Sequence, residues 1–262
     1  MNFKKYTRED IPLLEFDPDK TAVIEATHFV QKRDLPEYCV MPIYFSLLEK
    51  LKTDNVLEPV PEADLAAFSL SVYRVAYDGK YVAVAYPRVG APWATAMLEL
   101  LIGLGCRKFV ACGSAGVLCS DIKRGSIIIP DSALRDEGTS YHYCPPSRYI
   151  EMAPDVVKKL EIVLKKHLVS YRIGRTWTMD ALFRETRGKI EQRVAEGCLT
   201  VEMECSALIA ASRLHKVKFG QYLEAADDVC GNQWDRRELS DIEKMELREK
   251  LFWLSVEACL SL

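Results

Sequence analysis

Hydrophobic residues fall into short runs of two kinds, which alternate along the chain. Runs that are rich in β-branched residues, or that alternate with polar ones, are typical of strands, and they occupy 21–26, 68–77, 80–87, 106–116, 125–136, 169–177, 198–204 and 217–227. Runs with helical spacing occupy 91–105, 154–167, 185–196 and 236–260, a shorter one lies at 42–51, and small apolar residues follow 204. Residues 137–150 are polar and aromatic and are expected to form a loop.

Turn residues support this division of the chain. Asp78-Gly79 separates two alternating runs, which is a hairpin signal. Pro92 stands near the start of the helical run 91–105 and Gly105 at its end, where these residues are favoured. Alternating strands and helices predict an α/β sheet with helices on its faces. No low-complexity linker or internal repeat divides the chain, so we expect one domain over 1–262.

Composition and charge narrow the classes of function. A content of 49% hydrophobic and 28% charged residues excludes a disordered or fibrous protein. The net charge of -3, without an arginine-rich stripe, gives no sign of nucleic-acid binding. No apolar run approaches the ~20 residues that a membrane span needs, and MNFKKYTRED has no apolar signal core. We therefore expect a cytoplasmic protein that acts on a small molecule.

Cysteine usage indicates a reducing compartment. The nine cysteines are odd in number and form no C-x-x-C pair, so we expect reduced and mostly buried thiols. The four histidines show no ligand spacing with the cysteines, so neither a metal site nor a metal cofactor is expected.

The stretch TVEMECSALIAAS (200–212) places two carboxylates at the start of an apolar helix. The N–H groups and dipole of a helix N-terminus explain one of them, but the second remains unexplained unless it faces solvent. Glu204 could accept hydrogen bonds from both hydroxyls of a vicinal diol, and Met203 could lie under the apolar face of a sugar. The alternative for Met203 is ordinary core packing.

Three further stretches carry candidate chemistry at strand ends. GSAG (113–116) follows an apolar strand and offers N–H groups and the Ser114 hydroxyl to an anion, although a plain tight turn needs the glycines too. Asp227 and Asp228 point in opposite directions if extended, so at most one faces a pocket; the alternative is a turn or capping role. Phe183 could stack on a base or pack in the core.

Together these stretches resemble the nucleoside phosphorylase family, which includes purine nucleoside phosphorylase, uridine phosphorylase and the methylthioadenosine nucleosidases. The resemblance is carried, in the family's order, by VGAP (89–92), GSAGVL (113–118), DIKRGSIIIPD (121–131), VEMEC (201–205) and AADDV (225–229). It implies a single α/β domain with a central mixed sheet flanked by helices. It also implies nucleoside and phosphate as ligands, with no cofactor besides phosphate as co-substrate. A dimer-based homo-oligomer, as large as a hexamer, is expected as well.

The resemblance assigns roles to positions that match the family's motifs. The catalytic residue that supports departure of the base is Asp228. The remaining roles are ribose binding by Glu204 and Met203, base binding by Glu202, Phe183, Ala115 and Gly116, and phosphate binding by Gly113 and Ser114.

Two positions depart from the pattern of phosphate-using members. The arginine expected two residues before the glycine of GSAG is Ala111, and the glycine-aspartate-proline turn expected after the first strand is read as Ala26-Thr27-His28. Four arginines could substitute: Arg88, Arg135, Arg148 and Arg184. Arg88 is favoured because the resemblance implies that its loop lies next to the glycine turn, and the alternative for Arg88 is an ordinary surface arginine.

The resulting expectation is a nucleoside phosphorylase, a pentosyltransferase of purine salvage that releases a free base and ribose 1-phosphate. A hydrolase that uses water, a uridine phosphorylase and a non-catalytic nucleoside-binding protein remain as alternatives.

Overall fold

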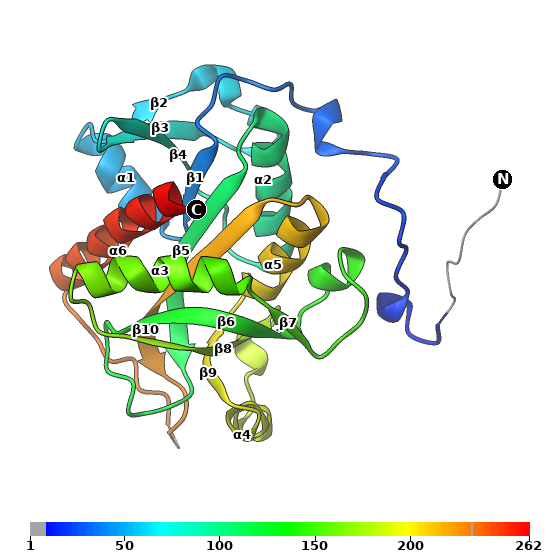
Figure 1. The fold of residues 1–262 in the computed structure, drawn as a ribbon. Coiled ribbons are helices and arrows are strands. Elements are labelled where there is room, and N and C mark those ends of the chain that lie inside the picture. The colour runs from blue at the N-terminus through cyan, green and yellow to red at the C-terminus, as the bar shows by residue number, and fades with distance from the viewer. Residues whose placement is uncertain (1–8, 232) are drawn as a thin grey trace.

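A mixed ten-stranded sheet forms the centre of the structure, which is a computed structural model describing residues 9–231 and 233–262 (Figure 1). Its strands are β1 (Tyr38–Pro42), β2 (Glu58–Pro59), β3 (Val72–Tyr77), β4 (Lys80–Ala85), β5 (Lys108–Val117), β6 (Ile127–Asp136), β7 (Tyr149–Glu151), β8 (Tyr171–Met179), β9 (Cys198–Glu202) and β10 (Lys218–Asp228). The helices are α1 (Phe45–Thr53), α2 (Ala91–Leu104), α3 (Pro154–Lys166), α4 (Arg187–Ala195), α5 (Cys205–Leu214) and α6 (Asp241–Ser261). The expected α/β fold with a mixed sheet is confirmed.

Part of the sheet closes on itself. β10 pairs in parallel with β5 and antiparallel with β6, while β6–β8, β8–β9 and β9–β5 are also paired. These five strands therefore form a ring of pairings. β1, β4, β3 and β2 extend the sheet outward from β5. Ring closure brings the ends of β5, β9 and β10 together, although they lie far apart in the sequence.

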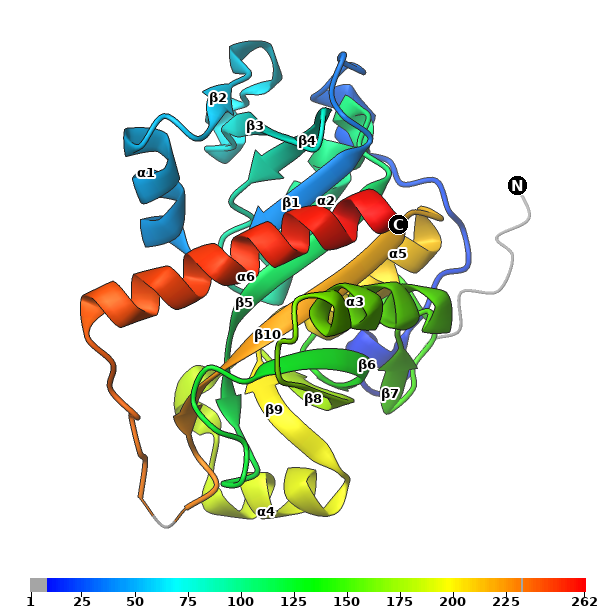
Figure 2. The same cartoon turned by 60° about the vertical axis from the view of Figure 1, so that its left-hand side comes forward.

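Helices cover both faces of the sheet (Figure 2). α3 packs against α6 on one face, and α2 packs against α5 on the other. α3 buries Val156, Leu160, Val163 and Leu164, which share one helical face. α5 is buried nearly all round, and its many small residues, alanine and serine among them, allow this close packing.

Most predicted elements are present, with boundaries shifted by a few residues. Residues 139–142 form a short 3-10 helix within the expected loop. All nine cysteines are free, and seven of them are buried. Among the described residues, no helix is both long and apolar enough to cross a bilayer. The N-terminal stretch read as lacking a signal core lies partly outside the described residues, which begin at residue 9.

Two structural predictions are wrong. Residues 21–26 form no strand, and Val23 is 95% exposed, because the strand positions on both sides of β1 are already taken by β4 and β5. GSAG is not a turn, because β5 continues through it to Val117 while pairing with β10. The backbone groups of Gly113 therefore lie in a sheet rather than in an open loop.

Candidate active site

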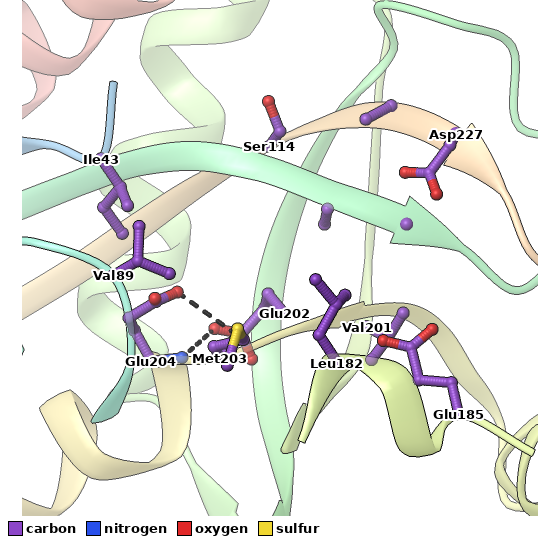
Figure 3. Close-up of a pocket in the computed structure, with 13 residues that line it drawn as sticks. Ile43, Val89, Ser114, Leu182, Glu185, Val201, Glu202, Met203, Glu204 and Asp227 are labelled. Carbon is purple, nitrogen blue, oxygen red and sulfur yellow. Dashed lines mark hydrogen bonds between the residues drawn. The ribbon is translucent and has the colours of Figure 1, made fainter. Parts of the chain in front are cut away.

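A pocket of about 240 Å³ opens where β5, β9 and β10 meet (Figure 3). Segments of these three strands form much of its wall, and the rest comes from the segments after β1, β4, β8 and β9. The lining residues are Ile43, Val89, Ser114, Ala115, Gly116, Leu182, Glu185, Val201, Glu202, Met203, Glu204, Ala226 and Asp227. Four of the sequence stretches singled out for chemistry thus meet at one place.

Glu202 is held by the start of α5. Its Oε2 accepts hydrogen bonds from the backbone N–H groups of Glu204 (2.8 Å) and Cys205 (2.7 Å), and Thr178 Oγ1 donates to its Oε1 at 2.5 Å. These are the N–H groups that a helix leaves unpaired at its N-terminus. The ordinary helix-capping explanation therefore accounts for Glu202, which lines the pocket with both oxygens already engaged.

Glu204 is the carboxylate that capping does not explain. It is 4% exposed, and its Oε1 accepts from the Gly90 amide at 2.6 Å, so the β4–α2 loop is tied to the start of α5. Within the described part of the chain, its Oε2 accepts a single, long hydrogen bond of 3.3 Å from the adjacent Met203 amide. Burial raises the pKa of both Glu202 and Glu204. One oxygen of Glu204 thus remains able to accept from a ligand beside Met203.

We expect Glu202→Leu to lower the free energy of unfolding by about 1–3 kcal/mol, because two N–H groups of α5 lose their buried acceptor. Glu202→Gln keeps an acceptor oxygen at the same place and should cost less than about 1 kcal/mol. Urea denaturation of both variants measures the difference. Equal stability of the leucine variant and the wild-type protein would contradict the capping role.

Two carboxylates lie at the opposite end of the pocket from Glu204 (Figure 3). Asp227, at the end of β10, accepts from Trp234 Nε1 at 2.6 Å. Glu185 follows a short 3-10 helix (Leu182–Arg184). Burial, and secondly the negative charge of Asp227, raise the pKa of Glu185 to about 7. Glu185 can therefore carry a proton at neutral pH.

Asp228, the expected catalytic residue, is not part of the pocket wall. Its Oδ2 forms a 2.6 Å ion pair with Arg237, and its Oδ1 accepts from the Cys230 amide at 2.8 Å. Successive side chains of a strand point to opposite sides, so Asp227 faces the pocket and Asp228 faces the segment after β10. As expected, no more than one of the two aspartates faces the pocket. That residue is Asp227, whereas the family resemblance had assigned the catalytic role to Asp228.

The expected phosphate ligands are only partly brought together. Ser114 lines the pocket, whereas Gly113 is buried, and a Cβ atom there would lie 3.3 Å from Ile43 Cβ. Arg88 does not line the pocket, because its guanidinium lies 5.5 Å from the centre of the Trp93 ring. The turn after the first strand is also corrected. Since that strand is β1, the turn is Ile43–Tyr44 and not Ala26-Thr27-His28.

Of the residues expected to contact the base, some line the pocket and one does not. Ala115 and Gly116 line the pocket, together with Glu202. Phe183 is 94% exposed and is absent from the wall, because the short 3-10 helix presents the neighbouring Leu182 to the pocket instead. Sequence reasoning missed Glu185, although it follows Phe183, which had been singled out as an aromatic residue, by two positions.

Comparison with known proteins identifies the family of this chain. The model of the phosphorylase superfamily matches residues 39–251. A guanosine phosphorylase from Halorubrum lacusprofundi is 23% identical over 78% of this chain and 84% of its own length. A uridine phosphorylase from Treponema pallidum is 28% identical over 68% of this chain and 71% of its own. The crystal structure of uridine phosphorylase from Vibrio fischeri superposes with a TM-score of 0.72 at 21% identity, covering 89% of this chain and 94% of that one.

Proposed function

This chain belongs to the phosphorylase superfamily and is a pentosyltransferase, and from this premise we propose that its pocket cleaves the N-glycosidic bond of a purine nucleoside with phosphate as the acceptor. The observation that carries the proposal is the placement of Glu204 and Met203 at one end of a pocket whose other end holds Glu185 and Asp227. A diol acceptor and a proton donor thus lie on either side of the space that a nucleoside would fill.

The ribose lies beside Met203, with its hydroxyls directed at Glu204. A buried carboxylate forms strong hydrogen bonds with hydroxyl groups, and the Gly90 amide fixes the orientation of this one. The thioether of Met203 gives the apolar face of the sugar a polarisable surface. These contacts hold the sugar while positive charge develops on it.

The base lies toward Glu185 and Asp227. Leu182, Val201 and Ala226 provide apolar contacts there, and the residues that line the pocket include no amide or guanidinium side chain that would pair with the carbonyl groups of uracil. A protonated Glu185 can donate to N7, an acceptor that purines have and pyrimidines lack. This difference supports a purine nucleoside as the substrate.

In the reaction, a phosphate oxygen bonds to C1′ of the ribose while the bond between C1′ and the base nitrogen breaks. The electron pair of that bond passes to the base, and Glu185 transfers its proton to N7, so that the products are neutral purine and ribose 1-phosphate. Burial, and secondly the negative charge of Asp227, raise the pKa of Glu185 and so keep its proton in place until this step. Ser114 is the pocket residue that offers a hydroxyl to phosphate.

Base release from a panel of purine and pyrimidine nucleosides, with and without phosphate, tests the proposal. We expect release from purine nucleosides only when phosphate is present, with one ribose 1-phosphate formed for each base. Equal release in phosphate-free buffer would show hydrolysis instead. Binding of nucleosides without any release would favour a non-catalytic binding protein.

A further inference from the structure

A buried carboxylate is the sheet neighbour of Ser114 and lies behind the pocket wall rather than in it. Glu224 of β10 is the register partner of Ser114 in β5, and it is 1% exposed. Its Oε2 accepts from the Tyr44 hydroxyl at 3.3 Å, and its Oε1 lies 3.2 Å from Arg124 Nη2. None of the roles described above uses Glu224.

Two guanidinium groups are close to this carboxylate. Arg124 comes from the segment between β5 and β6 and also donates to the Ala225 carbonyl at 3.3 Å. Arg248 comes from α6, lies 4.9 Å from the centre of the Tyr44 ring and donates to Ser46 Oγ at 3.1 Å. Both arginines act electrostatically on Glu224, the register partner of Ser114, although neither lines the pocket.

Ionised Glu224 opposes binding of an anion at the Ser114 end of the pocket. It neutralises Arg124 through the ion pair, and it repels a second negative charge across a short, poorly solvated distance. A neutral Glu224 would remove the repulsion and would free the Arg124 guanidinium, whose fork geometry suits a tetrahedral oxyanion.

We infer that Glu224 competes with the anionic co-substrate for Arg124 and Ser114, so that the anion binds to this site together with a proton taken up by Glu224. The inference rests on the proposed function and deepens it. It names the positive groups of the anion subsite and a proton that enters with the anion.

The titratable and charged groups around Glu224 are few. Tyr44 precedes α1, Cys112 and Ser114 belong to β5, Arg124 follows β5 and Arg248 belongs to α6. Burial raises the pKa of Glu224, whereas Arg124, Arg248 and hydrogen bonds from Tyr44 and Ser114 lower it. The net direction is upward, so the neutral form is accessible at a higher pH than for an exposed glutamate. Because only this form admits the anion, anion binding weakens as the pH rises through the pKa of Glu224.

Sulfate is a suitable probe, because it remains a dianion over the whole pH range in which the protein is folded. Calorimetric titration in buffers of different ionisation enthalpy measures the protons taken up for each sulfate bound. We expect uptake approaching about one proton at the alkaline end of the range, falling toward zero as the pH decreases. Failure of the wild-type protein to bind sulfate at any pH would overturn the inference.

Glu224→Gln should remove most of this proton uptake and should bind sulfate at least about tenfold more tightly than the wild-type protein near pH 8. Glu257→Gln removes the same charge from a carboxylate that is paired with Lys166 and His167, outside the pocket, and serves as the matched control. Unchanged affinity and proton uptake in a folded Glu224→Gln protein would contradict the inference. This result is independent of base release, so a wrong assignment of the reaction and a wrong role for Glu224 can be told apart.

Discussion

Replacing Glu204 with glutamine is expected to lower kcat/KM for a purine ribonucleoside by about 10²–10³-fold, and to lower it much less for the 2′-deoxyribonucleoside. Hydrogen bonds to a charged group contribute about 1.5–3 kcal/mol each, and the Glu204 oxygen that does not bind Gly90 can accept from both ribose hydroxyls. The glutamine can still accept from the Gly90 amide, but its NH₂ group cannot accept from a hydroxyl. The substitution therefore weakens the hydrogen bonds to the ribose diol and keeps the hydrogen bond that holds the β4–α2 loop.

Steady-state kinetics with matched ribo- and 2′-deoxyribonucleosides of one base measures this effect. Glu202→Gln is the control, because it alters the neighbouring carboxylate, whose oxygens are engaged by α5 and Thr178. We expect that control to retain the wild-type preference for ribose. An equal loss on both substrates in Glu204→Gln would mean that Glu204 does not bind the diol.

Glu185→Gln is expected to lower turnover of purine nucleosides by at least about 10²-fold, the usual contribution of a general acid. In the wild-type protein, kcat/KM should fall as the pH rises above about 7, because the pKa of Glu185 is raised to about 7 and only its protonated form can donate to N7. Asp227→Asn removes the neighbouring negative charge and so lowers the pKa of Glu185. The alkaline limb of the pH profile should then move to lower pH.

Asp228→Asn distinguishes this assignment from the role that the family resemblance gives to Asp228. The substitution breaks the ion pair with Arg237, so we expect a lower Tm, but an alkaline limb at the wild-type position. If instead Asp228→Asn abolishes turnover while Glu185→Gln retains it, the proton comes from Asp228. The measurement is the pH dependence of kcat/KM for the four proteins at a temperature where all are folded.

Local patterns in the sequence were sufficient for most of the fold. Some signals depend only on neighbours in the chain: the hydrophobic period, the Asp78-Gly79 turn, and Pro92 and Gly105 at the helix boundaries. The elements that they predicted, β3, β4 and α2, are present in the structure. The run at 21–26 has the same local pattern as a strand, yet its place in the sheet is decided by partners from other parts of the chain. Pattern alone could not show that β4 and β5 already flank β1.

The sequence by itself determined the α/β class, the family and the stretches that line the pocket, because motifs such as VEME and GSAG are contiguous in the chain. Only the tertiary structure decided how individual side chains point. Side chains alternate between the two sides of a strand, and this alternation directs Asp227 rather than Asp228 into the pocket. The short 3-10 helix directs Leu182 rather than Phe183 into it. The tertiary structure also revealed Glu224 beside Ser114, with arginines from two distant segments. Burial and long-range charge set the chemistry of these carboxylates, and neither quantity exists until the chain has folded.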